Sequence, residues 1–290
     1  MRKKKKTVRK RRKNLKGYSF SKRIKIIIAI FAISMFLCTF AVFYVVLGSY
    51  DGLGLPQNLA ENEYDMQNLS SEDGLITYDD ANYSSLKGID VSYYQKEIDW
   101  QKVKESGIDF VMIRLGYRGS EEGDLYTDSR FRDNLKGAKK AGLRVGVYFF
   151  SQAVNPEEAV EEAKYVIRRI RGKGIDFPVV FDMEPVSADD RISELTTMEK
   201  TEIADAFCQI IELNGHEAMI YGNPHWLANH LDLSYLTDYE VWLAHYTEVT
   251  DYPYQFAMWQ YTDSGSVEGI SGEVDLNLYF VKKDKDRTEE

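Results

Sequence analysis

The stretch "FPVVFDMEPV", residues 177–186, decides how the rest of the chain is interpreted. It is an apolar run that ends in Asp182, Met183 and Glu184 and is followed by a proline. A short apolar run between turn-forming residues is typical of a buried strand. Side chains two positions apart point to the same face of a strand. The sequence therefore predicts a buried strand whose end presents Asp182 and Glu184 to one side.

Similar short runs, rich in β-branched and aromatic residues, recur along the chain, and helical periodicity lies between the earlier ones. The clearest helix has Asn155 as N-cap and Pro156 in its first position, and a second covers residues 196–215. The predicted strands are residues 88–94, 110–117, 144–151, 177–184, 218–223, 240–246, 256–262 and 274–280.

Eight strands with helices between the first five predict an α/β fold, a closed barrel. The connections between the last strands are too short for ordinary crossover helices. We therefore expect an irregular, TIM-like (β/α) barrel with a helix-poor final part. In such barrels the chemistry lies at the C-terminal ends of the strands, which is where Asp182 and Glu184 fall.

Other strand ends carry further candidates. Asp90 in "GIDVS" is an acid inside an apolar strand, and burying an unpaired carboxylate is costly, so it should have a partner or a task. Asp275 in "EVDLN" is a weaker case, because strand starts often carry acids. Aromatic rings pack against the CH faces of sugars, although each could equally fill the core; those near the strand ends are Tyr93, Tyr117, Tyr148, Tyr221, Trp242, Tyr246, Trp259 and Tyr261.

Two neighbouring carboxylates suit several roles. Their repulsion raises one pKa, which leaves an acid beside an anion, as glycosidic bond cleavage requires. A Mg²⁺ or two-metal site would also use paired carboxylates, and a solvated acidic turn needs no function. The four histidines lack metal-ligand spacing, and neither a G-x-S-x-G elbow nor a phosphate loop is present. We expect no metal and no cofactor.

The N-terminal part has a different composition. Residues 1–25 contain 14 of the 37 Lys and Arg residues and no acid, which leaves 23 basic against 46 acidic residues downstream and argues against a nucleic-acid binder. Residues 26–47 carry no charge, about the length of a membrane-spanning helix. A cleaved signal peptide is the alternative, but its apolar region would be shorter, and no clear A-x-A site follows.

Because the basic residues precede the apolar segment, we expect a single-pass anchor in the cell membrane with a cytoplasmic N-terminus. The predicted domains are a basic cytoplasmic tail (1–25), a transmembrane helix (26–47), an extracellular linker (48–85), an extracellular barrel (86–282) and a charged tail (283–290). The linker is assigned from its polar, weakly patterned sequence.

Residues 87–282 resemble the glycoside hydrolase family 25 lysozymes, the N-acetylmuramidases of the Chalaropsis type. The matching pieces occur in the family's order and cover nearly the whole barrel. They are "KGIDVSYYQ", "IDWQKVKESGIDFVMIRLGYR", "AKKAGLRVGVYFFSQA", "FPVVFDMEPV", "IYGNPHW", "VWLAHY" and "MWQYTDSGSVEGISGEVDLN". The resemblance implies an irregular (β/α) barrel that hydrolyses the β-1,4 bond between N-acetylmuramic acid and N-acetylglucosamine in peptidoglycan glycan strands.

The resemblance also implies residue roles. Glu184 would be the general acid, and Asp182 would assist at the anomeric centre by orienting the 2-acetamido group. Asp90 matches a further cleft acid, taken as catalytic. The expected substrate contacts are Asp275, Tyr148, Tyr221 and Trp259, with Tyr117 added for its place at a strand end.

Two rival functions remain open. Chitinases and endo-N-acetylglucosaminidases also use D-x-E, but with further acids upstream on the strand, where this chain has residues 177–180, "FPVV". A non-catalytic wall-binding barrel would share the scaffold without needing the acids. The intact Asp90, Asp182 and Glu184 favour an enzyme that acts outside the cell in wall remodelling.

Overall fold

The computed structural model describes residues 59–72 and 74–283. The predicted cytoplasmic tail and transmembrane segment, and the charged tail after residue 283, lie outside the described residues. Within the described part, no helix combines the length and apolar character that crossing a membrane would need.

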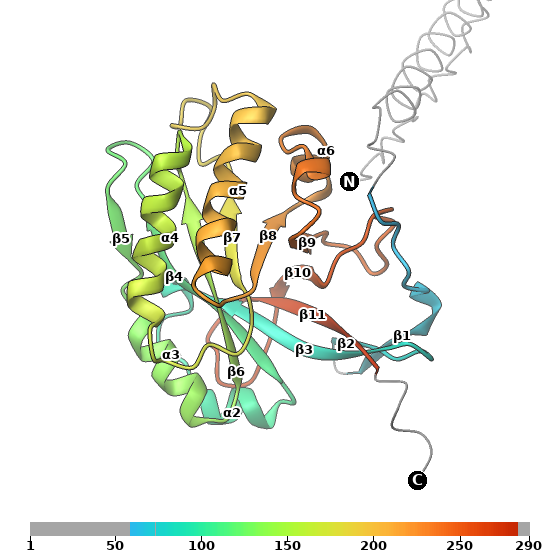
Figure 1. Cartoon of the computed structure of the whole chain (residues 1–290). Coiled ribbons are helices and arrows are strands. Elements are labelled where there is room, and N and C mark those ends of the chain that lie inside the picture. The colour runs from blue at the N-terminus through green and yellow to red at the C-terminus, as the bar shows by residue number, and fades with distance from the viewer. Residues whose placement is uncertain (1–58, 73, 284–290) are drawn as a thin grey trace, which may run out of the picture. The chain divides into compact units, whose positions relative to one another are not determined.

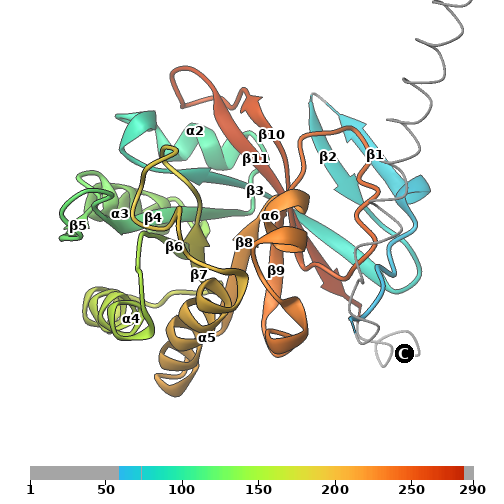
Figure 2. The same ribbon diagram turned by 90° about the horizontal axis from the view of Figure 1, so that it is seen from above.

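Eight strands form a closed barrel (Figures 1 and 2). Their order around the barrel is β3-β11-β10-β9-β8-β7-β6-β4, and pairing of β3 with β4 closes it. A short ninth strand, β5 (Leu125–Thr127), pairs with the end of β4. The barrel strands are β3 (Tyr83–Val91), β4 (Phe110–Arg118), β6 (Arg144–Ser151), β7 (Val179–Met183), β8 (Ala218–Gly222), β9 (Glu240–Ala244), β10 (Met258–Gly265) and β11 (Val274–Lys282).

The prediction of an irregular eight-stranded barrel is confirmed, but the barrel is mixed and only loosely TIM-like. β11 runs antiparallel to both of its neighbours, β10 and β3, whereas the other barrel strands run parallel to one another. Only residues 266–273 separate β10 from β11. A parallel crossover needs about a dozen residues or more, so this connection allows only an antiparallel return.

The helices are α2 (Trp100–Glu105), α3 (Phe131–Lys140), α4 (Pro156–Ile170), α5 (Thr197–Leu213) and α6 (Pro224–Asn229), with short 3-10 turns at 66–68, 93–95 and 233–235. The Asn155 side chain caps α4, as predicted. Thr196 and Glu199 form a reciprocal capping box at the start of α5. These end signals explain why both helices begin where the sequence analysis placed them.

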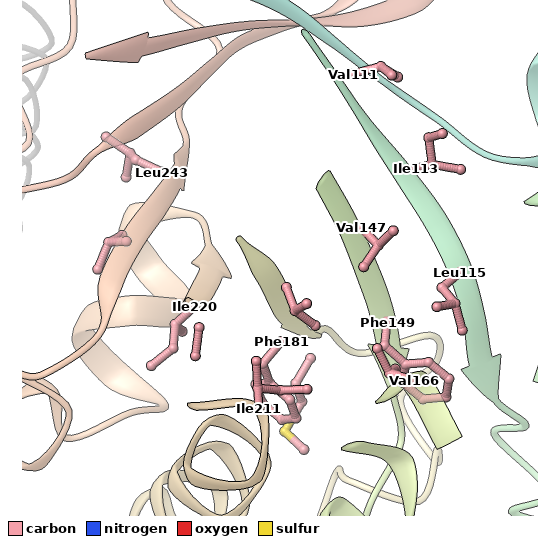
Figure 3. Close-up of a cluster of buried hydrophobic side chains, with 14 of the residues drawn as sticks. Val111, Ile113, Leu115, Val147, Phe149, Val166, Phe181, Ile211, Ile220 and Leu243 are labelled. Atoms are coloured by element: carbon pink, nitrogen blue, oxygen red, sulfur yellow. The ribbon is translucent and has the colours of Figure 1, made fainter. Parts of the chain in front are cut away.

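The outward faces of the strands pack against the helices. Val111, Ile113 and Leu115 of β4, with Val147 and Phe149 of β6, lie in this layer, and Val166 of α4 and Ile211 of α5 meet it from outside (Figure 3). All of these side chains are fully buried. The strands therefore project the intervening residues into the barrel.

A second apolar cluster lies inside the barrel, and its aromatic residues fill the end at which the parallel strands begin. Phe110 stacks on Phe177 with ring centroids 4.7 Å apart. Gly88 makes room for this pair, because a Cβ there would lie 2.1 Å from the Phe110 ring. The barrel is thus plugged at its N-terminal end, and a polar site can open only at the C-terminal ends of the parallel strands.

The predicted linker, residues 48–85, is wrong for its described part. β1 (Leu69–Glu72) and β2 (Leu75–Tyr78) form a hairpin on the side of the barrel opposite α4 and α5 (Figures 1 and 2). Tyr64 stacks on Phe280 of β11 at 3.8 Å, and Tyr78 is fully buried. The packing of Tyr64 and Tyr78 was not predicted from the sequence because the residues around them are polar. The folded domain therefore begins before the predicted boundary at residue 86.

Candidate active site

A cavity of about 260 Å³ opens at the C-terminal ends of the parallel strands. We call it the cleft. It brings together six of the eight predicted site residues: Asp90, Asp182, Glu184, Asp275, Tyr148 and Tyr221. Its other lining residues are Val91, Ser92, Tyr94, Gln95, Arg114, Phe150, Trp242, Tyr246 and Gln260.

β7 and the residue that follows it supply two of the acids. The strand alternates, so Phe181 and Met183 enter the outer core while Asp182 lines the cleft. Asp182 is buried, whereas Glu184, the next residue of the cleft-facing series, is half-buried. Burial, followed by the charge of Glu184, raises the pKa of Asp182 well above its usual value, and the Arg114 charge opposes this. Burial and then Asp90 raise the pKa of Glu184. The neighbouring acids thus raise one another's pKa values in this part of the cleft.

Asp90 is held by a network that crosses the barrel. Its Oδ2 accepts hydrogen bonds from Gln260 Nε2 and Asn277 Nδ2, each at 2.8 Å. Gln260 Oε1 accepts from the hydroxyls of Tyr221 and Tyr246, at 2.9 and 3.0 Å. Burial raises the pKa of Asp90 to about 6, and the two amide hydrogen bonds limit the rise. The predicted partner for this buried acid is thus a pair of side-chain amides.

Asp275 faces Asp90 from the neighbouring strand, since the two are register partners in the β3–β11 ladder. Burial, followed by the Asp90 charge, raises the pKa of Asp275 to about 8. Arg114 is a cation in the cleft lining, and its Nε donates to Asp128 at 2.9 Å. The cleft therefore concentrates four acids in a confined space, and the pKa of each is raised.

Two sequence predictions fall outside the cleft. Trp259 is fully buried in the outer core, where its Nε1 donates to the His245 carbonyl at 2.8 Å. It does not line the cleft, because its neighbour Gln260 occupies the inward position of β10. Tyr117 is half-buried and stacks on Tyr126 at 5.2 Å, with the Arg114 guanidinium 5.6 Å from its ring. It supports Arg114 without lining the cleft.

Sequence reasoning missed several polar groups of the site. Gln260, Asn277 and Arg114 were not among the candidates, although each lies on the inward phase of a predicted strand. Trp242 and Tyr246 were noted as aromatic residues at strand ends, yet not assigned to the site. Trp242 Nε1 donates to Asn277 Oδ1 at 2.8 Å, and its ring meets that of Tyr221 edge-on at 4.9 Å. Strict alternation counted from Asp275 would have found Asn277, two residues further along β11, whereas Gln260, Arg114 and Trp242 lie on strands that carry no acid among the predicted site residues.

Among the described residues, no group of three or more His, Cys, Asp or Glu side chains is arranged to hold a metal ion. The four cleft acids instead lie beside aromatic rings and side-chain amides. Coupled carboxyls with raised pKa values next to aromatic rings form the kind of site that glycoside hydrolases use.

Comparison with known proteins identifies the family. The profile of the glycosyl hydrolases family 25 matches residues 89–270, so the chain belongs to this family. It is 32% identical over 195 residues to the autolytic lysozyme of Clostridium acetobutylicum, covering 67% of this chain and 56% of that protein. It is 30% identical over 211 residues to lysozyme M1 of Streptomyces globisporus, covering 69% of each.

Solved structures agree. The modular autolysin LytC from Streptococcus pneumoniae, in complex with a synthetic peptidoglycan ligand, matches with a TM-score of 0.61 and 25% identity over 73% of this chain and 52% of that one. A bacterial lysozyme from Streptomyces coelicolor matches with a TM-score of 0.53 and 26% identity, over 67% and 91%. The chain thus spans little more than half the length of the autolytic lysozyme and of LytC.

Proposed function

We propose that this protein is an N-acetylmuramidase that hydrolyses the β-1,4 bond between N-acetylmuramic acid and N-acetylglucosamine in peptidoglycan. The observation that carries the proposal is a pair of carboxyls, Asp182 in β7 and Glu184 directly after the strand, which both line the cleft. Family membership, the relatives named lysozymes and the peptidoglycan ligand of LytC support the choice of substrate.

In this mechanism Glu184 is the general acid. It is half-buried at the cleft, and its raised pKa increases the fraction of the carboxyl that still carries a proton as pH rises toward neutral. The proton goes to the glycosidic oxygen as the bond to the anomeric carbon breaks, and water completes the hydrolysis by adding its oxygen to that carbon and losing a proton. An acid with an ordinary pKa would already be ionised at that pH.

Asp182 acts at the anomeric centre. Its Oδ1 is buried and has no hydrogen-bond partner within residues 59–72 and 74–283. A buried acceptor without a partner is costly, so a donor from the substrate would be favoured there. The N–H of a 2-acetamido group has the required chemistry. Its hydrogen bond, with the Arg114 charge, would favour the anionic form of Asp182 while positive charge develops on the sugar.

Asp90 supplies a fixed negative charge. Gln260 and Asn277 hold its carboxylate from two strands, so it needs no reorganisation when charge develops. Tyr148, Tyr221 and Trp242 offer ring surfaces in the cleft lining that suit the apolar faces of sugars. These residues would orient the glycan strand across the acids.

The cellular setting is also part of the proposal. Residues 26–47 would anchor the protein in the cell membrane, with residues 1–25 in the cytoplasm and the barrel outside, where it would take part in wall remodelling. The support comes from the sequence: 22 uncharged residues follow a segment with 14 Lys and Arg residues and no acid.

The deciding experiment is digestion of purified peptidoglycan by the full chain in detergent, followed by reduction and mass spectrometry of the new ends. Reduced N-acetylmuramic acid is the expected product. Reduced N-acetylglucosamine would instead identify an endo-N-acetylglucosaminidase. A folded protein that binds peptidoglycan and produces no new reducing ends would be a non-catalytic wall-binding barrel.

A further inference from the structure

A line of hydrogen bonds reaches the main chain of Glu184 from outside the cleft. The Glu184 carbonyl accepts a hydrogen bond from Gln152 Nε2 at 2.8 Å. Gln152 is fully buried and directly follows β6. Its own carbonyl accepts from Arg191 Nη1 at 2.7 Å. Gln152 therefore links the residue after β7 to the loop that carries Arg191.

Arg191 is itself fixed by Glu158, in the first turn of α4. The guanidinium donates to both carboxylate oxygens, at 2.9 and 2.8 Å. Such bidentate pairs fix orientation as well as distance. Burial opposes the charge on Glu158, but the hydrogen bonds from Arg191 and from the Val154 N–H, together with the charges of Arg118 and Arg191, lower its pKa. The pair is thus ionised and directional near neutral pH.

The loop between Glu184 and Arg191 has its own internal bracing. The buried Asp190 accepts hydrogen bonds from the main-chain N–H groups of Val186, Ser187 and Ile192. Because these contacts close the loop on itself, the position of Arg191 is transmitted to the chain that follows Glu184.

Glu184 needs this support because the sheet does not provide it. β7 pairs with β6 as far as Met183, opposite Ser151, and with β8 as far as Asp182, opposite Tyr221. Glu184 is the first residue beyond both ladders. The Gln152 bond replaces the missing strand partner and fixes the peptide plane from which the Glu184 side chain departs.

We propose that Gln152 and Arg191, the latter held by Glu158, are positioning residues that fix the direction in which the Glu184 carboxyl enters the cleft. The identity of the reaction rests on the proposed function, but the positioning rests on the contacts alone. A displacement of about 1 Å at a reacting group can cost roughly a hundredfold in rate. Loss of either residue therefore slows turnover in protein that is still folded.

The test compares Gln152→Met, Arg191→Met and Arg191→Lys in the full chain, in detergent. Gln152→Met keeps the buried volume and removes the donor to Glu184. Arg169→Met is the matched control, since Arg169 is also half-buried and donates to Thr127 Oγ1 and the Tyr165 carbonyl, away from Glu184. On soluble glycan strands, kcat should fall at least about tenfold in both Met variants of the network, with KM changed less than about twofold. The kcat of Arg191→Lys should be intermediate between that of the Met variants and that of wild type. The kcat of Arg169→Met should equal that of wild type.

A second measurement does not require hydrolysis. Titration of the Glu184 carboxyl by ¹³C NMR, assigned by its absence in Glu184→Gln, reports its surroundings directly. The groups that face it (Asp90, Asp182, Tyr221, Tyr246 and Asp275) are unchanged in the network variants. We expect the apparent pKa of Glu184 to move by about half a unit or more in Gln152→Met, and not in Arg169→Met.

The two readouts separate the possible failures. Folded Gln152→Met and Arg191→Met proteins with wild-type kcat and a wild-type Glu184 titration would reduce the network to a structural role and overturn the positioning proposal. A wild-type protein that does not cleave peptidoglycan would refute the proposed function. In that case the titration alone decides whether the network positions Glu184.

Discussion

Asp275 lies directly opposite Asp90 across the antiparallel ladder of β11 and β3. Burial and this neighbouring charge raise the pKa of Asp275 to about 8. A carboxyl whose pKa is higher in the folded than in the unfolded state makes the folded protein bind more protons. The stability contributed by Asp275 is therefore greatest at low pH and is lost as pH rises from about 4 to about 8.

Asp275→Asn should remove this dependence. Relative to wild type, the variant should gain at least about 1 kcal/mol in the free energy of unfolding between pH 4 and pH 9, since one pKa unit corresponds to about 1.4 kcal/mol. Urea unfolding at several pH values measures this difference in the free energy of unfolding. Asp251→Asn, at a side chain that is 96% exposed, serves as control. A difference between Asp275→Asn and wild type that does not change with pH would contradict the raised pKa.

Asp182 in β7 and Glu184 directly after it should differ in their kinetic signatures. Glu184→Gln cannot donate a carboxylic proton, so kcat should fall by about 10²–10⁴-fold while circular dichroism stays unchanged. Wild-type activity should decline on the alkaline side as the acid with the raised pKa ionises, and Glu184→Gln should lack that limb. Asp182→Asn should also lower kcat but keep the alkaline limb, because it removes the anion and leaves the proton donor. A folded Glu184→Gln protein with near wild-type kcat would move the acid role to Asp90 or Asp275.

Residues 59–82, which precede β3 and were predicted to be part of a linker, should contribute to the stability of the folded domain. Tyr64 stacks on Phe280, and its hydroxyl donates to the Phe256 carbonyl at 2.8 Å. Tyr64→Ala should lower the free energy of unfolding by roughly 2–4 kcal/mol, as large-to-small changes at packed aromatic residues do. Tyr235→Ala, at a residue 67% exposed, should change it by less than about 0.5 kcal/mol. Equal stability of the two variants in urea would show that residues before β3 are dispensable.

The eight strands and the two main helices could be predicted because their signals are local. Apolar runs mark the strands, and Asn155 and Thr196 mark helix starts through their own side chains. The antiparallel direction of β11 follows from connection length, a signal that was present but was used only to exclude helices. The hairpin before β3 was missed because a few aromatic contacts hold it, and those contacts join residues far apart in the sequence.

The site shows the same limit more sharply. Asp182, Glu184 and Asp90 were found because an acid inside an apolar strand is conspicuous. Gln260 and Asn277 were missed because an amide carries no such mark, and their role depends on which face of the strand points inward. An error of one position on β10 selected Trp259 instead of Gln260, since one step along a strand reverses the face.

Topology can be tested on intact cells with the wall removed. If residues 26–47 anchor the protein with the basic segment inside, protease added outside should release the barrel by cutting before residue 59. A tag at the N-terminus should stay protected until the membrane is permeabilised. Recovery of the barrel in the medium of untreated cells, without its N-terminal segment, would favour a cleaved signal peptide.

Substitution by Phe should affect different properties at two tryptophans of neighbouring strands: catalysis at Trp242 and thermal stability at Trp259. Trp242 lines the cleft, and its Nε1 donates to Asn277, which in turn donates to Asp90. Trp242→Phe leaves a ring but removes that donor, so Asn277 is free to rotate away from Asp90. We therefore expect kcat/KM to fall at least about fivefold, because a buried hydrogen bond contributes about 1 kcal/mol. Trp259 donates to the His245 carbonyl from the outer core. Trp259→Phe should therefore lower the thermal unfolding temperature while kcat/KM of the folded enzyme stays within about twofold of wild type. Steady-state kinetics on soluble glycan strands and thermal melts of both variants make the comparison. A Trp259→Phe enzyme with reduced kcat/KM and unchanged melting would return Trp259 to the substrate contacts where the sequence analysis placed it.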